Sequence, residues 1–462
     1  MSTLTSIRSF PSFSQSVRFS SSGACRPQPK PAPSAPGHSE ESSFEPSRES
    51  TKAPASSPAE QKALKEMNKL LDGAATKSRS NGSTVTADAA NVESKSNLKS
   101  GARGRQAAQL LEANAQLEQQ RLAGLSAQER AQYKAVKEAT LNGASNPVAA
   151  LSLQKMLFEG KLPGAKDLTG KGTLLDHLAS VAKGDKLDGR VDKNTFVTDL
   201  VQELATPSAI NQGSRGTCAP TAMSINLALN HPAEYARIMS DLASPSGKVQ
   251  LADGKTTLTR EPETSFKPDG TGRALTQRLM APVFMEASNG KKSYNDRTGS
   301  GAGASSTSLD VLHDAVYGRN MAYDEVSSSE RGAAMKRIDS ELASGQNVLA
   351  GIRWGGAGSG HKVLITGTEK VNGKDYVNFI NPWGTEERMP RSEFQSRLHG
   401  INYDPSTATK PSPATPSRPG SVVKPSPVPP SEPVARPGPV EVPSGFPFDI
   451  ELLLRRFSFL LG

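Results

Sequence analysis

The sequence predicts an α+β fold: helices through its middle, an antiparallel sheet after them, and disordered tails at both ends. Apolar residues recur three or four positions apart over residues 105–204, as they do along one face of a helix. Runs with strand composition follow at 348–354, 361–369 and 376–380. The tails are too rich in Pro and Ser to supply a hydrophobic core, so we expect them to be disordered.

Composition limits how much of the chain folds and what it binds. Only 35% of the 462 residues are hydrophobic, and 40 are Gly and 34 are Pro. This indicates one well-formed core flanked by long disordered stretches. The formal net charge is +9, but the basic residues are scattered, so we expect no nucleic-acid partner. Because no run of 18 apolar residues occurs, we also expect no transmembrane segment.

Local signals mark the ends of several elements. Ser57-Pro58-Ala59-Glu60 and Ser126-Ala127-Gln128-Glu129 are capping boxes, each of which predicts the start of a helix. Residues 261–306 look mostly like loop, with a helical turn around 279–285. Asn372-Gly373 separates two of the predicted strands and is typical of a two-residue hairpin turn.

One stretch, from Asn211 to Ala222, carries the first candidate for catalysis. A loop punctuated by glycine runs into Cys218, one of the two cysteines, and a helical run follows it. At a helix N-terminus the unpaired N–H groups and the helix dipole favour a negative charge. The Cys218 thiol is therefore expected to ionise easily, and the thiolate is the nucleophilic form.

Two partners for this thiol lie on the predicted strands. His361 opens one strand behind a glycine loop, and Asn381 ends the next strand. Cys, His and Asn supply a nucleophile, a general base and a group that orients the base. A tight hairpin would bring the ends of the two strands side by side through its register. We expect the helix that bears Cys218 to pack against this antiparallel sheet.

These motifs resemble those of the papain-like cysteine proteases, in both the papain and the calpain branches. The match comprises Gln212-Gly213-Ser214-x-Gly216-x-Cys218, the glycine before His361, and Asn381-Pro382-Trp383-Gly384, and it covers roughly residues 205–400. The resemblance implies a papain-like fold and a cysteine-type peptidase that forms a thioester on Cys218. It implies that His361 moves the proton and that Asn381 holds the imidazole. It further implies that the Gln212 side chain and the Cys218 backbone N–H form the oxyanion hole, and that Trp383 covers the His–Asn bond.

The sequence departs from the family at two places and leaves alternatives open. Ala219 stands where the family usually has an aromatic residue, and Lys362 stands where a small or apolar residue is common. Both departures bear on substrate preference. The same site could instead transfer the acyl group, as deamidases and transglutaminase-type effectors do. A non-catalytic adaptor with a protease-like scaffold is the other alternative, although the presence of all four site residues argues against it.

Five segments are expected along the chain. Residues 1–104 form a largely disordered Ser/Pro-rich region, and residues 105–204 form a helical region. Residues 205–403 form the papain-like catalytic domain that the resemblance implies. Residues 404–447 are a Pro-rich linker, and residues 448–462 have the apolar stripe of an amphipathic helix. That helix is expected to dock on its own domain, with a partner groove or a membrane surface as alternatives.

The expected partner is a protein or peptide substrate. No metal or cofactor is expected, because no cluster of His, Cys and carboxylate residues has the spacing of ligands. Cys25 and Cys218 do not make a disulfide framework. Localisation stays unknown: the first 39 residues lack an apolar h-region, which argues against a Sec signal peptide. A plain tail on a cytoplasmic protein, a transit peptide and the leader of a secreted effector all fit.

Overall fold

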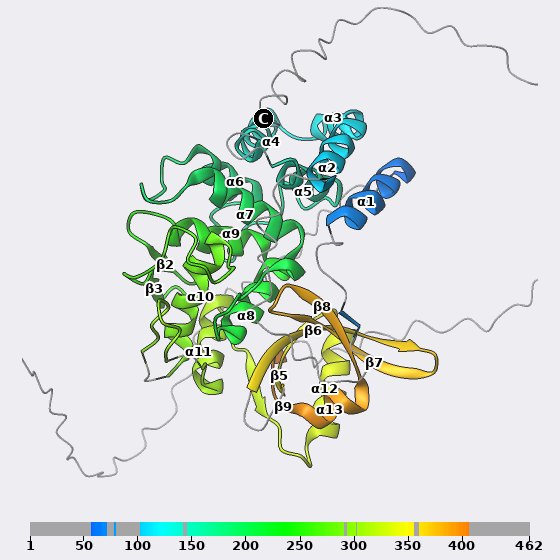
Figure 1. Ribbon diagram of the computed structural model, residues 1–462, viewed down its shortest axis with the longest axis vertical. Coiled ribbons are helices and arrows are strands. Elements are labelled where there is room, and N and C mark those ends of the chain that lie inside the picture. Colours follow the sequence, from blue (N-terminus) through cyan, green and yellow to red (C-terminus); the bar gives the residue numbers. More distant parts are fainter. Residues whose placement is uncertain are drawn as a thin grey trace, which may run out of the picture. The chain divides into compact units, whose positions relative to one another are not determined.

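The computed structural model describes residues 57–71, 78–79, 102–141, 146–290, 293–301, 303–354 and 360–405. These residues form a mixed α+β fold with a largely antiparallel sheet, as the sequence predicts (Figure 1). The helix predicted over 448–462 lies outside the described residues, as do Cys25 and nearly all of the linker predicted over 404–447.

Seven helices are described before residue 206: α1 (Pro58–Leu71), α2 (Ala102–Ala113), α3 (Ala115–Ala123), α4 (Ala127–Leu141), α5 (Pro147–Phe158), α6 (Leu174–Lys183) and α7 (Lys193–Ala205). The capping box predicted at Ser126 forms, since the Ser126 N–H donates to Glu129 and the Glu129 N–H donates to the Ser126 hydroxyl. Helix α5 is buried from Val148 to Phe158, and α1, α2, α4 and α7 all pack against it.

The next group of elements comprises a 3₁₀ turn (Pro207–Ala209), α8 (Cys218–Asn230), α9 (Pro232–Leu242), β2 (Lys248–Gln250), β3 (Thr257–Thr259), α10 (Leu275–Ser288) and α11 (Ser306–Tyr317). Helix α10 is longer than the turn predicted at 279–285 and continues through Pro282. Nearly all of α8 is buried, because α7, α9 and α10 surround it and β6 lies against it. One hydrophobic core joins these helices to α1–α7.

The sheet comprises β1 (Ser78–Arg79), β4 (Ala322–Glu325), β5 (Val348–Arg353), β6 (Gly360–Val371), β7 (Lys374–Asn381), β8 (Thr385–Pro390) and β9 (Leu398–Tyr403). Its strand order is β1-β8-β7-β6-β5-β9-β4, and every pair is antiparallel except β1 with β8. Helices α12 (Arg331–Ala343) and α13 (Arg391–Arg397) complete the described fold.

The predicted hairpin forms between β6 and β7. Asn372 and Gly373 have φ values of 49° and 79°, the left-handed conformations that this type of turn requires. Val371 lies opposite Lys374, and a bulge between Ile365 and Gly367 shifts the register before the strands reach their far ends. The hairpin therefore delivers the first residues of β6 and the last residues of β7 to one end of the sheet.

The two faces of the sheet belong to different cores. Leu349, Leu364 and Ile380 point into the core that contains α8, because alternate residues of a strand share a face. Val363 and Phe379 belong to the core that contains residues of α12 and α13. The sheet thus lies between two layers. Helix α8 packs against β6 on one face, and residues of α12 and α13 cover the other face.

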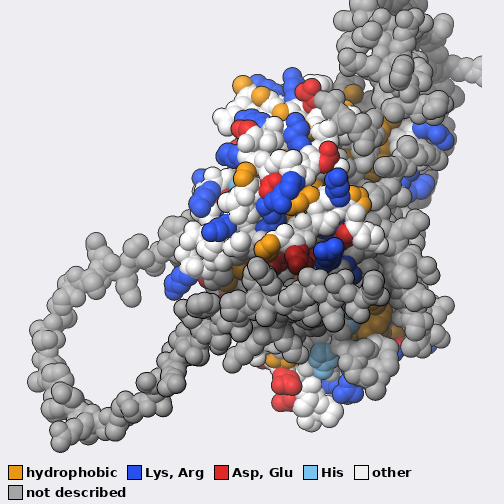
Figure 2. All heavy atoms as spheres, turned by 60° about the vertical axis from the view of Figure 1, so that its left-hand side comes forward, with side chains coloured by type: hydrophobic (Ala, Val, Ile, Leu, Met, Phe, Trp, Pro, Cys, Tyr) orange, Lys and Arg blue, Asp and Glu red, His pale blue; other side chains and the backbone are white. Residues whose placement is uncertain are grey.

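Surface charge on the described residues is mixed. On the face shown in Figure 2, Lys and Arg side chains are scattered among Asp and Glu side chains rather than gathered in one patch. None of the described helices is both long and apolar enough to cross a membrane.

Candidate active site

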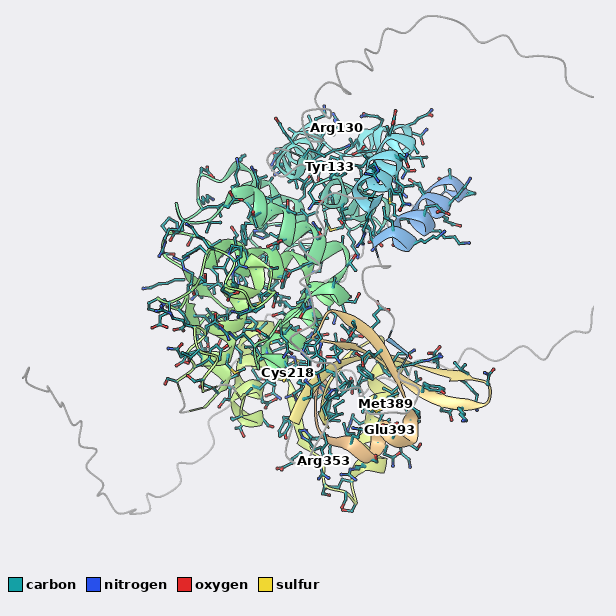
Figure 3. The ribbon with its side chains drawn as sticks, viewed as in Figure 1. Arg130, Tyr133, Cys218, Arg353, Met389 and Glu393 are labelled. Carbon is teal, nitrogen blue, oxygen red and sulfur yellow. The ribbon has the colours of Figure 1, made fainter. Side chains whose placement is uncertain are left out.

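The candidate nucleophile, Cys218, is the first residue of α8, and Figure 3 shows it where that helix meets the strands. The loop before it makes a close turn: Gly213 has a φ of 59°, and a Cβ there would lie 2.1 Å from the Thr271 carbonyl oxygen. Only glycine fits this turn without displacing the backbone. Cys218 as a residue is partly exposed.

The helix N-terminus at Cys218 is not capped by a side chain. Thr217 occupies the N-cap position but makes no side-chain capping bond, and its hydroxyl has no hydrogen-bond partner among the described residues. The first N–H groups of a helix have no partner within the helix. Their partial positive charge therefore remains available to stabilise a thiolate or an oxyanion at this end of α8.

The structure brings Cys218, His361 and Asn381 together. His361 is buried at the start of β6, and its ring lies close enough to the Cys218 thiol for each group to shift the pKa of the other. His361 Nε2 lies 2.9 Å from Asn381 Oδ1, and Asn381, the last residue of β7, is fully buried. Because Nε2 is engaged by Asn381, the other ring nitrogen, Nδ1, is left to face the sulfur.

Electrostatics favour the charged form of this pair. Burial alone would raise the pKa of Cys218, but the hydrogen bond and positive charge of His361, with help from Lys362, lower it. Burial alone would lower the pKa of His361, but the hydrogen bond and negative charge of Cys218, together with Asn381, raise it. Both shifts favour a thiolate beside an imidazolium.

Two indole rings enclose the imidazole. Trp383 stacks on His361, with ring centroids 4.6 Å apart and planes 21° apart. The Trp354 centroid lies 5.2 Å from that of His361 and 5.7 Å from that of Trp383. These rings exclude water from the His361–Asn381 hydrogen bond.

The Gln212 loop is tied to the turn that follows Asn381. The Gln212 backbone N–H donates to the Pro382 carbonyl over 2.7 Å, and Asn211 forms a β-bridge with Trp383. The Gln212 side chain is buried, and its Nε2 donates to the Arg215 carbonyl over 2.7 Å. A primary amide has two N–H groups. Within the described residues Nε2 has only the Arg215 carbonyl as acceptor, and the buried Gln212 Oε1 has no hydrogen-bond partner.

Lys362, which departs from the family pattern, is buried near the thiol. It lies on the same face of β6 as Leu364, and its Nζ donates to Asn402 Oδ1 over 2.8 Å. Burial lowers the pKa of Lys362 to about 8, against the raising influence of the charges on Cys218 and Asp310. Its backbone N–H also helps to lower the pKa of the Cys218 thiol. Lys362 therefore adds a second cation to the surroundings of the Cys218 thiol.

Sequence reasoning missed Glu387, which lies behind Asn381. Asn381 Nδ2 donates to Glu387 Oε1 over 3.1 Å. The sequence feature that could have revealed Glu387 is the acidic pair Glu386-Glu387 shortly after Gly384. This segment has a polar composition, which does not predict a strand. Strand alternation would have placed Glu387 on the Asn381 face once β8 was recognised.

No group of three or more His, Cys, Asp or Glu residues is placed to hold a metal ion within the described ranges. A scan against models of protein families and a search of curated proteins found no match to this chain. The chemistry proposed below therefore rests on the residues of the site and their geometry.

Proposed function

We propose that this chain is a cysteine-type peptidase of papain-like type, which cleaves peptide bonds through a thioester on Cys218. One observation carries the proposal: the His361 ring lies close enough to the Cys218 thiol to lower its pKa, and a hydrogen bond to Asn381 holds that ring on its other side. A structural cysteine is usually a buried hydrophobe without charged partners. A thiol that shares a proton with an oriented imidazole has the arrangement of an activated nucleophile.

In the proposed reaction each group has one role. The Cys218 thiolate attacks the peptide carbonyl carbon, and the carbonyl oxygen becomes an oxyanion. The Cys218 backbone N–H and Gln212 Nε2 donate hydrogen bonds to that oxyanion. His361 then transfers its Nδ1 proton to the leaving amine as the C–N bond breaks, which leaves a thioester on Cys218.

Hydrolysis of the thioester completes the cycle. His361 Nδ1 takes a proton from water, and the resulting hydroxide attacks the thioester carbonyl. The C–S bond breaks, the product leaves as a carboxylic acid, and Cys218 returns as the thiolate beside the protonated His361. Asn381 keeps the ring oriented through both steps, since it accepts from Nε2 throughout.

A product analysis tests the proposal. The purified chain is incubated with casein, an unstructured protein, and the fragments are examined by mass spectrometry, with Cys218→Ala as the control. New carboxyl termini that depend on Cys218 would support hydrolysis. Transfer to an amine, or loss of ammonia from a glutamine, would identify an acyl transferase or a deamidase instead. Modification of Cys218 by an epoxide inhibitor with no substrate turned over would favour the adaptor alternative.

A further inference from the structure

Glu387 makes contacts that the proposed catalytic cycle does not use. Its Oε1 accepts from Asn381 Nδ2 over 3.1 Å and from the Thr385 hydroxyl over 2.9 Å. The residue is 7% exposed, and its Oε2 is buried with no hydrogen-bond partner among the described residues. An unpaired buried carboxylate oxygen destabilises a fold, so its presence calls for a functional explanation.

The strand register explains how Glu387 reaches Asn381. In the β7–β8 pair Asn381 lies opposite Thr385, and Phe379 lies opposite Glu387. Alternate residues share a face, so all four side chains lie on one side of the sheet. Asn381 and Glu387 are diagonal neighbours on that face, within reach of a long side chain.

The hydrogen bonds determine which way the Asn381 amide points. A carboxylate only accepts hydrogen bonds, so the Asn381 amide must direct its N–H₂ group at Glu387. Its oxygen then faces His361, and because an amide oxygen only accepts, His361 Nε2 must carry a hydrogen. The second ring nitrogen is consequently the one that exchanges a proton with the thiol.

We propose that Glu387 is a positioning residue: it fixes the orientation of the Asn381 amide, and through it the tautomer and charge of His361. The part of this proposal that concerns turnover rests on the proposed function, whereas the part that concerns the thiol–imidazole pair does not. Glu387 acts through Asn381 and touches neither the nucleophile nor a substrate.

The charges around the imidazole support this role. Those that act on His361 come from Cys218 on α8 and Glu387 on β8, and the Glu387 charge helps to raise the pKa of His361. Lys362, on the other face of β6, acts on the thiol and is itself influenced by Asp310 on α11. Burial raises the pKa of Glu387, although its bonds to Thr385 and Asn381 and the charge on His361 oppose the shift.

The test compares Glu387→Gln with Glu386→Gln, its neighbour on the opposite face of β8. Glutamine keeps the shape of Glu387 but removes its charge and can present either an oxygen or an N–H₂ group. The rate at which iodoacetamide labels Cys218 is measured across pH. In Glu387→Gln we expect labelling to begin at a higher pH than in the parent, since the weakened imidazolium supports the thiolate less. Glu386→Gln should follow the parent.

The ionisation of Glu387 determines the pH range in which the labelling difference should appear. Glu387 carries its charge only above its own raised pKa. The difference between Glu387→Gln and the parent should therefore be present above that pKa and disappear as the pH falls below it. A difference that stays constant at all pH values would indicate a general disturbance of the site and would overturn the proposal.

A double-mutant cycle tests whether Glu387 acts through Asn381. With casein as substrate, we expect Glu387→Gln to lower kcat/KM about tenfold, the size expected for one hydrogen bond to a charged group. In an Asn381→Ala background the same change should have almost no effect. Independent, multiplicative losses would show that Glu387 does not work through the amide, and would refute the proposal.

Two further measurements separate the possible failures. If circular dichroism shows that Glu387→Gln does not fold, Thr385→Val is measured in its place. This change removes the other hydrogen bond to Glu387 Oε1 and should shift the labelling profile in the same direction by a smaller amount. An unchanged profile in a folded Thr385→Val would then count against the proposal. If the parent chain cleaves no peptide, the proposed function fails, but the labelling profiles still decide whether Glu387 positions the pair.

Discussion

The Trp383 indole lies nearly parallel to the His361 imidazole, with ring centroids 4.6 Å apart. The same tryptophan belongs to the turn that the Asn211 bridge holds against the Cys218 loop. One side chain therefore covers the His361 imidazole while its backbone connects the two halves of the candidate site. This double role makes Trp383 a sensitive position to change.

Trp383→Ala should lower kcat/KM by up to about tenfold, since a stacked aromatic pair contributes about 0.5–1.5 kcal/mol beyond its buried area. The cause is exposure of the His361–Asn381 bond to water. Trp383→Phe keeps an aromatic face and should retain most of the activity. Steady-state kinetics on a casein-derived peptide provide the measurement, and equal activity of the alanine variant and the parent would contradict the shielding role.

His361→Ala should abolish turnover, because His361 is the described histidine that lowers the pKa of the thiol. The far-ultraviolet circular dichroism spectrum should stay nearly unchanged. The matched control is His231→Ala. His231 follows the last residue of α8, at the opposite end of the helix from Cys218. Full activity in His361→Ala, or a dead His231→Ala with normal folding, would refute the assignment of the base.

Gln212→Ala should reduce kcat far more than it raises KM, since the amide N–H donates fully only when the oxyanion forms. For one such donor the expected loss is about 10²–10³-fold. Gln212→Glu keeps the size of the side chain but replaces the donor with an acceptor, so it should be at least as impaired. An unchanged kcat in both variants would exclude Gln212 from the oxyanion hole.

Lys362→Met should raise the pKa of the Cys218 thiol, because it removes a cation that stabilises the thiolate. Labelling by iodoacetamide should then begin at a higher pH than in the parent. Lys362 itself has a pKa of about 8, so the difference should be largest below that pH and shrink above it. Lys370→Met, an exposed position on the same strand, is the control and should match the parent.

The free energy of unfolding should fall as the pH rises from mildly acidic to mildly alkaline values, because two buried carboxyl groups lose their protons in this range. These groups join α7 to α9 and α10. Asp199 accepts from the Leu275 N–H, and Glu203 accepts from the Tyr235 hydroxyl. Burial raises the pKa of Asp199 to about 7 and that of Glu203 to about 8. The folded state therefore binds more protons than the unfolded state between the ordinary carboxyl pKa values and these raised ones.

The direct check is the melting temperature of Glu203→Gln from about pH 4 to about pH 9. The stabilisation from the neutral carboxyl is fully present below its unfolded pKa and is lost as the pH passes the folded pKa. The glutamine variant cannot ionise, so its melting temperature should fall less with rising pH. Parallel curves for the variant and the parent would show that Glu203 does not titrate in this range.

Short-range sequence signals predicted the parts of the fold that neighbouring residues determine. The Asn372-Gly373 turn forms with both residues in the left-handed region, and the Ser126 capping box starts α4. Cys218 begins a helix, as the loop and the apolar run after it indicated. Each of these features depends on dihedral preferences and hydrogen bonds within a few residues, which a sequence displays directly.

Other features needed the folded chain. Strand β8 reads as polar because half of its residues face away from the core, so neither the strand nor Glu387 was expected. The hairpin brings His361 and Asn381 to the same end of the sheet. The bulge between Ile365 and Gly367 shifts the register by one residue and so determines which face of the sheet the two side chains share.

The sequence by itself therefore determined the residue types, the local turns and the helix start that make a thiol-based site possible. Tertiary structure alone decided that Lys362 is buried beside the thiol and that Glu387 lies behind Asn381. The physical reason is that a diagonal contact between strands, or a charge that burial makes influential, depends on register and packing across distant segments.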